Sequence, residues 1–368
     1  MAPRLPCHGP SSACFPSRPT PGRAFVSGDS SLMSPAIDIA IVGATGTVGA
    51  AIVEILEERD FPVGQLHLLA SPASAGKSVS FKGRNLRVKS IEAFDFAQVR
   101  LVFFAAGQAV TRQYASQARA AGCMLVDLSG ALPLQQAPRV VAEVNPQVLE
   151  KLEAPCQVTS PASQVVALAL ALAPLRPLVR WRHLGVTACL PVSSLGREGV
   201  AELARQTTEL LNGRPPEPRF FDRQIAFNLL GRVGESDTAG HTGLERRLVE
   251  ESRQVLDAPE LKISVTCLMA PVFFGDSLSL AVQASQAIDP SAVRAALERA
   301  PGLELIEPDD CPTVIGDAVG QDVAYVGRVR TGVDDACELD LWIASDNVRK
   351  GSALNAVQLA ELLIKQGR

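Results

Sequence analysis

Residues 37–49 join a short apolar strand to a glycine-rich turn, and an amphipathic helix follows. Ile37–Val42 is apolar apart from Asp38, and glycines stand at 43, 46 and 49 in a G-x-x-G-x-x-G spacing. Ala50–Glu58 then has its large apolar residues on one predicted helical face. A glycine turn between a strand and a helix lets the backbone approach a pyrophosphate, and the helix N-terminus supplies positive potential. The segment therefore predicts the start of a dinucleotide-binding α/β domain.

The three glycines have separate expected roles in this turn. Gly43 permits the tight turn, Gly46 leaves clearance for phosphate, and Gly49 lets the helix pack closely. The predicted cofactor-binding residues of the turn are the glycines and their neighbours: Gly43, Thr45, Gly46, Thr47, Val48 and Gly49. A turn of this kind also persists for packing alone after binding is lost, and that alternative stays open.

Strands and helices alternate through the next ninety residues. Leu66–Ala70, Leu101–Ala105 and Met124–Asp127 are predicted strands, and Thr111–Ala121 is a predicted helix. This order is typical of a doubly wound, Rossmann-like domain. The second strand ends at Ala70-Ser71 without an acidic residue for a ribose hydroxyl, which disfavours NAD. NADP binding would rely on Ser71, Ser74 and Lys77, although such a cluster is equally typical of a solvated loop.

The sequence pattern changes after about residue 162. Val165–Leu175 is an uninterrupted apolar run, shorter than the ~20 residues that span a bilayer, and it predicts a buried helix. The strand-like runs that follow are Leu184–Val192, Ile263–Cys267, Leu278–Gln283, Val323–Arg328 and Glu338–Ala344. Together they predict a mixed α+β domain with a large sheet, and Arg349–Lys365 is expected to be helical again.

Charge and composition exclude several classes of function. The chain has 35 basic and 39 acidic residues, so neither nucleic acid nor an anionic membrane is an expected partner. Its eight cysteines form no C-x-x-C pair and its four histidines are scattered, which argues against a metal site and favours a reducing cytoplasm. Residues 1–32 hold six prolines and one acid, and we expect residues 1–33 to be a disordered tail or a mis-assigned start before Met33.

Several stretches, in this order, resemble aspartate-semialdehyde dehydrogenase from residue 37 almost to the C-terminus. They are Gly43–Gly49, Leu69–Ser71 with Ser74–Lys77, Val126–Ser129, Ala142–Asn145, Gln224–Asn228, Pro271–Gly275 and Arg349–Gln358. The resemblance implies a homodimer whose NADP domain (34–160 and 346–368) is completed by the C-terminal helix and includes Asn347 among its cofactor contacts. It also implies a central catalytic and dimerisation domain over 161–345.

The family's chemistry needs a thiolate to form a thioester, a histidine to move protons, a glutamine to orient the acyl group, and cations for carboxylate and phosphate. At the matching positions this chain has Ser163 for the cysteine, Leu190 for the glutamine, Met269 for the arginine and Asp276 for the histidine. Pro133 and Ala73 replace the arginines for the substrate phosphate and the cofactor 2′-phosphate. A substrate-binding lysine maps to Arg247, near Glu245. The chain thus resembles the Usg-type paralogues, in which this site is altered.

Ser163 has two interpretations. It is either an activated nucleophile, without a G-x-S-x-G elbow, or a residue that caps the helix after it, and the cap is favoured. A relocated thiol at Cys156, Cys189 or Cys267 is disfavoured, since buried cysteines commonly pack in strands.

Three functions follow from these replacements. The favoured one is a homodimer without the semialdehyde reaction, with weak or lost NADP binding and a binding, regulatory or partner role. The alternatives are an active NADP-dependent oxidoreductase for a more apolar aldehyde or acyl substrate, and a subunit of mixed dimers with an active paralogue.

Overall fold

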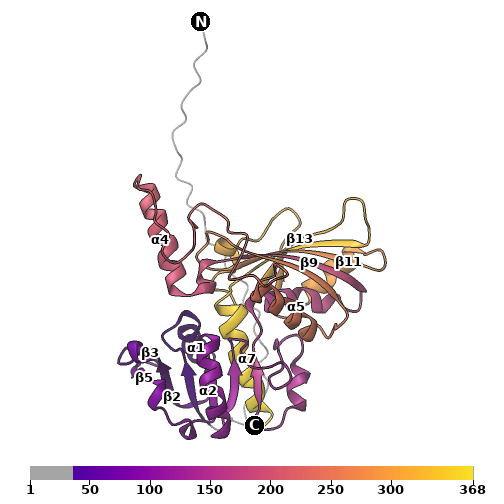
Figure 1. The fold of residues 1–368 in the computed structure, drawn as a ribbon. Coiled ribbons are helices and arrows are strands. Elements are labelled where there is room, and N and C mark those ends of the chain that lie inside the picture. The colour runs from indigo at the N-terminus through magenta and orange to yellow at the C-terminus, as the bar shows by residue number, and fades with distance from the viewer. Residues whose placement is uncertain (1–35, 368) are drawn as a thin grey trace, which may run out of the picture. The chain divides into compact units, whose positions relative to one another are not determined.

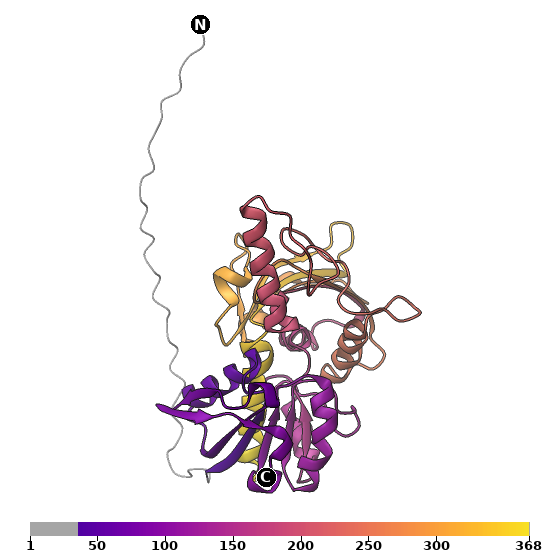
Figure 2. The same ribbon diagram turned by 60° about the vertical axis from the view of Figure 1, so that its left-hand side comes forward.

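Two six-stranded sheets organise the chain in the computed structural model, which describes residues 36–367. Figures 1 and 2 show the strands of the first sheet in indigo to magenta, and those of the second sheet in rose to yellow. The expectation for residues 1–33 lies outside the described residues. No helix among residues 36–367 is long and apolar enough to cross a membrane.

The first sheet is parallel throughout, in the order β5-β2-β1-β6-β7-β8. Its strands are β1 (Ile37–Val42), β2 (Val63–Ala70), β5 (Lys89–Ser90), β6 (Leu101–Phe104), β7 (Met124–Asp127) and β8 (Gln157–Thr159). A hairpin, β3 (Ser78–Phe81) with β4 (Arg84–Arg87), lies outside this sheet, and the helices are α1 (Thr47–Glu58) and α2 (Gln108–Ala120). The predicted strands and the doubly wound class are confirmed.

The C-terminal segment completes this first layer, as predicted. The short helical segment η8 (Arg349–Leu354) runs into α7 (Asn355–Lys365), which Figure 1 shows in yellow beside the N-terminal strands. Apolar residues of α7 are buried in the same core as β1, α1 and β7. Asn355 accepts from the Ala142 backbone and donates to the Val140 carbonyl, so polar bonds also fasten this segment.

The second sheet is mixed, in the order β10-β9-β11-β14-β13-β12, with β9/β10 and β12/β13 parallel and the other pairs antiparallel. Its strands are β9 (Trp181–Leu190), β10 (Lys262–Met269), β11 (Asp276–Ala284), β12 (Leu303–Leu305), β13 (Ala324–Thr331) and β14 (Glu338–Ser345). The helices of this half are α3 (Ser163–Leu172), α4 (Arg197–Leu211), α5 (Gly243–Val255) and α6 (Pro290–Glu298). Further short helical segments are η1 (Pro72–Ser74), η2 (Ile91–Ala93), η3 (Phe96–Gln98), η4 (Pro146–Lys151), η5 (Ala173–Leu175), η6 (Val192–Leu195) and η7 (Val314–Ala318).

The predicted buried helix is α3, which is buried from Gln164 to Leu172. It packs with α5 and α6 on one face of the second sheet and forms the largest apolar core. The other face has alternating exposed and half-buried residues, such as Thr187 in β9 and Ser279 in β11. One side of the sheet is therefore covered by helices, and the other is left open.

Candidate functional site

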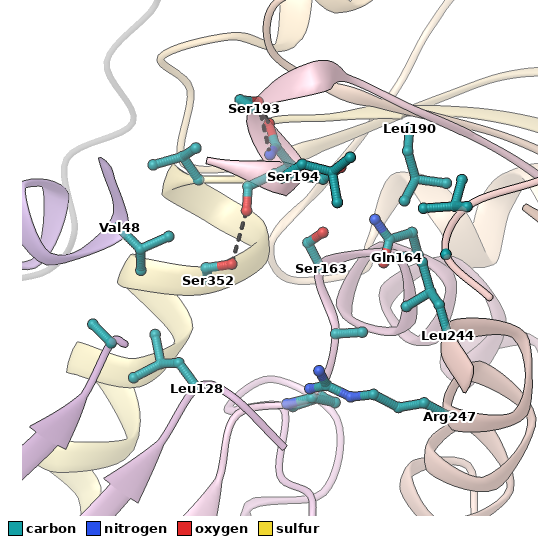
Figure 3. A pocket seen from close by; sticks show the side chains of 18 of the residues that line it. Val48, Leu128, Ser163, Gln164, Leu190, Ser193, Ser194, Leu244, Arg247 and Ser352 are labelled. Carbon is teal, nitrogen blue, oxygen red and sulfur yellow. Dashed lines mark hydrogen bonds between the residues drawn. The ribbon is translucent and has the colours of Figure 1, made fainter. Parts of the chain in front are cut away.

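A cavity of about 480 Å³ lies where α3, α5, η6 and η8 meet the ends of the first sheet. It is lined by small, apolar and hydroxyl side chains: Val48, Ala105, Ala106, Leu128, Pro161, Ala162, Ser163, Gln164, Leu190, Ser193, Ser194, Leu195, Val233, Gly234, Leu244, Arg247, Asn347, Val348 and Ser352. Among the described residues in this lining, Arg247 alone carries a charge. Figure 3 shows Ser163, Gln164 and Arg247 around the same space.

The Ser163 hydroxyl is bonded to a buried carboxylate. Its Oγ donates to Asp276 Oδ2 at 2.5 Å, and Gln164 Nε2 donates to Asp276 Oδ1 at 2.8 Å. The N-cap of α3 is Ala162, with Ser163 as the first helical residue, so the favoured helix-cap interpretation is wrong. The hydroxyl is used by a residue 113 positions away, in β11, rather than by its own helix.

Asp276 lies behind Ser163, away from the cavity lining, and is 1% exposed. Burial raises the pKa of this carboxyl to about 6, and the negative charge of Asp346 acts in the same direction. The hydrogen bonds from Ser163 and Gln164 oppose that shift. Asp276 is thus a buried proton acceptor that titrates closer to neutral pH than an ordinary aspartate.

None of the three cysteines weighed as a relocated thiol lines this cavity, as far as the described residues show. Burial raises the pKa of the Cys267 thiol to about 12 and also raises that of Cys189. Cys156 is buried in the core of the first layer. These environments disfavour a reactive thiolate.

A buried ion network lies beneath α3. Glu251 Oε1 accepts from Arg139 Nε at 3.1 Å and from Arg247 Nε at 2.9 Å. Glu251 Oε2 accepts from the Ala162 backbone N–H at 2.7 Å, and Arg247 Nη1 also donates to the Ser129 carbonyl. The network fixes the chain immediately before Ser163 and directs the Arg247 guanidinium to the cavity.

The other replaced family positions are divided between the Ser163 cavity and its surroundings. Leu190 lines it, but Met269 is buried and lines a neighbouring cavity of about 780 Å³. Pro133 lines a hollow beside α2, and the position-73 residue is exposed in η1. Glu245 accepts backbone N–H groups of Thr242 and Cys267 with its two oxygens, so it supports the start of α5 and lines no part of this cavity.

A second cavity of about 390 Å³ adjoins the glycine turn and shares Ala105 and Ala106 with the Ser163 cavity. Gly43, Thr45, Gly46 and Ser71 line it, whereas Ser74 and Thr47 do not. Val48 and Asn347 line the Ser163 cavity instead. The predicted cofactor residues are thus spread along two adjoining hollows.

Close backbone packing requires two of the three glycines of the turn. Gly43 has a φ of +89°, and a Cβ there would lie 2.7 Å from the Ala105 carbonyl oxygen. A Cβ on Gly49 would lie 2.2 Å from the Gly43 oxygen, so the third glycine lets α1 approach the turn itself. A Cβ on Gly46 would meet only the Gly43 oxygen, at 3.2 Å. Gly43 and Gly49 are thus needed for packing alone, whereas Gly46 lines the cavity of about 390 Å³ at the N-terminus of α1, where a phosphate would meet unpaired backbone N–H groups.

Sequence reasoning missed four residues that matter here: Gln164, Glu251, Arg139 and Glu92. Glu92 lines the cavity beside Ser71, and no lysine or arginine among the described residues lines that cavity. An acidic group therefore reaches this region from η2 rather than from the end of β2. Among residues 36–367 no cluster of His, Cys, Asp and Glu is arranged to hold a metal ion.

A parallel sheet with a glycine turn, beside a mixed sheet that supplies the facing site, defines a two-domain protein of the dinucleotide-fold dehydrogenase class. The semialdehyde dehydrogenase NAD binding domain matches residues 38–152, and the semialdehyde dehydrogenase dimerisation domain matches residues 172–350. The chain belongs to this family.

Three relatives illustrate the similarity. A protein named USG-1 protein homolog from Azotobacter vinelandii is 99% identical over 336 residues, which cover 91% of this chain and 100% of that protein. A probable aspartate-semialdehyde dehydrogenase from Pseudomonas aeruginosa is 53% identical, with a TM-score of 0.88 over 90% of this chain and 100% of that one. Aspartate semialdehyde dehydrogenase II from Vibrio cholerae is 38% identical, with a TM-score of 0.87 over 90% and 99%.

Proposed function

We propose that this chain is a dinucleotide-fold homodimer that does not carry out the semialdehyde dehydrogenase reaction and has a binding, regulatory or partner role. The observation that carries the proposal is the Ser163–Asp276 pair, which occupies the positions of the family's cysteine and histidine. A serine hydroxyl is a far weaker nucleophile than a thiolate. The ester that it would form with the acyl group is also a poorer hydride acceptor than the thioester that a cysteine forms. The site therefore lacks the group on which the family's reaction depends.

The surroundings of Ser163 support the same conclusion. Leu190 faces the cavity where the family has a glutamine, and Met269 is buried where it has an arginine. Arg247 is the charged group of the lining, and two of its nitrogens are already bonded to Glu251 and Ser129. A substrate with both a carboxylate and a phosphate would need a further cation.

For the cofactor, we propose a dinucleotide at the glycine turn, with NADP bound weakly or not at all. Residues 34–160 and 346–368 would form this domain, and 161–345 the central one. The support for this is the cavity of about 390 Å³ that Gly43 and Gly46 line beside the N-terminus of α1. Glu92 beside Ser71 would repel a 2′-phosphate, and position 73 supplies no arginine to bind it. Bound dinucleotide would supply hydride chemistry, while the turn only holds and orients it.

The homodimer would form through the second sheet, within the residues that match the dimerisation domain. The apolar side chains of its strands face α3, α5 and α6, so exposed apolar surface lies elsewhere. Phe227 and Leu229, on the segment before α5, are 68% and 60% exposed, and no helix covers the open face of the second sheet among the described residues. A second copy of the chain would cover this surface. Mixed dimers with an active paralogue would be detected by co-purification.

A second candidate is an active oxidoreductase for a more apolar aldehyde or acyl substrate. The lining of the Ser163 cavity favours it, because Leu128, Leu190 and Leu244 would contact an apolar chain. This second candidate predicts that the protein reduces the dinucleotide in the presence of an apolar aldehyde, whereas the favoured role predicts no such reduction.

The test is phosphate-dependent reduction of NADP, and of NAD, with aspartate semialdehyde and with a series of apolar aldehydes. We expect no turnover above a protein-free control with any of them. Turnover with aspartate semialdehyde would overturn the proposal, and turnover restricted to apolar aldehydes would establish the second candidate.

A further inference from the structure

Ser163 stands between a buried base and an open cavity. Its hydroxyl donates to Asp276 at 2.5 Å, while its side chain lines the cavity that Asp276 does not reach. Gln164 donates to the other carboxylate oxygen at 2.8 Å and holds the carboxylate in place. A nucleophile, a base within hydrogen-bond reach and a third group that orients the base form the arrangement of an activated hydroxyl.

The burial of Asp276 suits it to accept a proton. Its pKa is raised to about 6 mainly by burial, and a base is most effective when its pKa lies near the working pH. The ionisable groups that face it are Asp346 beside η8, Cys189 on β9 and Cys267 on β10. All three are neutral or negative, so none of the facing groups among residues 36–367 is a cation that would neutralise this carboxylate.

Donors for a developing oxyanion are available at the start of α3 and on Arg247. Ser163 and Gln164 are the first two residues of α3, and the N–H groups of a first helical turn have no acceptor within the helix. Arg247 lines the same cavity, and its Nη2 is buried without a hydrogen-bond partner among the described residues. Preorganised donors of this kind stabilise the tetrahedral intermediate of acyl transfer.

We propose that Ser163 is an acyl-accepting nucleophile, with Asp276 as its base and Gln164 as a positioning residue, for oxyesters of short apolar acids. The apolar lining from Leu128, Leu190 and Leu244 would hold the acyl chain. This activity goes beyond the proposed function and needs no dinucleotide.

The reaction balances without an oxidant or reductant. The Ser163 oxygen bonds to the ester carbonyl carbon, and its proton passes to Asp276. The bond from carbonyl carbon to leaving oxygen then breaks, and that oxygen takes a proton from a water in the cavity, which leaves hydroxide. The hydroxide attacks the acyl-serine carbonyl carbon, and the bond to the Ser163 oxygen breaks. The Ser163 oxygen takes its proton back from Asp276, so a carboxylic acid is released and the serine is restored.

The experiment combines covalent labelling with ester turnover on the full chain. Diisopropyl fluorophosphate should add one diisopropylphosphoryl group at Ser163, located by peptide mass spectrometry. 4-Nitrophenyl acetate, butyrate and hexanoate should be hydrolysed at the same site. Both activities should disappear in Ser163→Ala and persist in the matched control Ser116→Ala, a serine exposed on α2.

The variant Asp276→Asn tests whether Asp276 acts as a base or only as a structural partner of Ser163, because it removes the carboxylate and keeps the Ser163 hydroxyl. We expect at least about a hundredfold slower labelling, within the range for loss of a general base. The rate for the unmodified chain should rise through about pH 6 to a plateau, following Asp276, and this inflection should vanish in the variant.

Two results would overturn the proposal. One is the absence of an adduct at Ser163 under conditions that label a known serine hydrolase to completion. The other is labelling or hydrolysis that is equally fast in Asp276→Asn and independent of pH between 5 and 8. Circular dichroism of each variant distinguishes lost chemistry from lost folding.

Discussion

Replacing Asp276 by asparagine should stabilise the protein at high pH and leave it unchanged at low pH. Burial raises the pKa of this carboxyl from an ordinary 3.8 to about 6. A folded-state pKa above the unfolded value means that the carboxyl's stabilising contribution is complete below about pH 4 and is lost as the pH rises through about 6. A separation of about two pH units at 1.36 kcal/mol each amounts to about 3 kcal/mol.

Asparagine suits the site because it has the same shape and carries no charge. Its Oδ1 would still accept from Gln164 Nε2, and its amide would donate to the Ser163 oxygen in place of the present bond. The variant should therefore be more stable by up to about 3 kcal/mol at pH 8 and equal within about 0.5 kcal/mol at pH 4.

The assay is urea unfolding followed by tryptophan fluorescence, at one fixed protein concentration because the chain is proposed to dimerise. Asp222→Asn, which removes an exposed carboxylate, is the control and should give differences below about 0.5 kcal/mol at both pH values. A destabilised Asp276→Asn at pH 8, or the same stability difference at pH 4 and pH 8, would contradict a raised pKa of Asp276 in the folded protein.

Three further predictions concern the cofactor and the assembly. Gly46→Val should abolish dinucleotide binding measured by calorimetry, because a branched side chain would fill the space beside the Gly43 oxygen, and tight binding that survives it would refute the site. Glu92→Lys should strengthen binding of NADPH on the order of tenfold and leave NADH nearly unchanged, whereas equal effects on both would place Glu92 away from the 2′-position. Gel filtration with light scattering should give a dimer at micromolar concentration, and a stable monomer would contradict the proposed interface.

The parts of the fold that were predicted correctly have strong local patterns. β1, β7 and α3 are continuous apolar runs, and the glycine spacing marks the turn before α1. α1 begins at Thr47, three residues before the predicted start, because Gly49 of the glycine turn already lies within the first turn of the helix. The hairpin β3–β4 and the short strands β5, β8 and β12 were not predicted, since each has only two to four residues with polar ones among them, and so lacks the apolar run that marks β6 and β7.

The candidate site was predictable in position but not in its interactions. Ser163 and Asp276 were identified by their places in a family pattern, and the structure brings them together across 113 positions. The helix-cap interpretation failed because a serine at a helix start has a local partner in most proteins, whereas this hydroxyl meets a buried carboxylate from β11. Glu251 lies 112 positions from Arg139, and no sequence spacing signals such an ion pair.

Burial also decides the interpretation of the acidic residues. Glu245, which lies near the expected substrate-binding residue Arg247 in sequence, accepts backbone N–H groups of Thr242 at the start of α5 and of Cys267 in β10. Glu92 carried no sequence signal, because it reaches the cofactor cavity from a short helical segment rather than from the end of a strand. The positions of both side chains depend on the paths of loops around the sheets, and composition and periodicity do not predict those paths.

Steady-state turnover of aspartate semialdehyde with NADP and phosphate tests most directly whether the Ser163 site has lost the family's reaction. The proteins to compare are the unmodified chain, Ser163→Cys, and Ser163→Cys combined with Leu190→Gln, Met269→Arg and Asp276→His. A thiol at position 163 would lie beside the Asp276 carboxylate instead of a histidine, and a neighbouring negative charge disfavours the thiolate, so a thiol with an ordinary pKa of ~8.5 would stay largely protonated. Residues that act as one catalytic unit also regain little when a single member returns. We predict no turnover above background for the unmodified chain or for Ser163→Cys, with measurable turnover confined to the combined variant. Substantial turnover by either of the first two would contradict the claim that this site has lost the family's reaction.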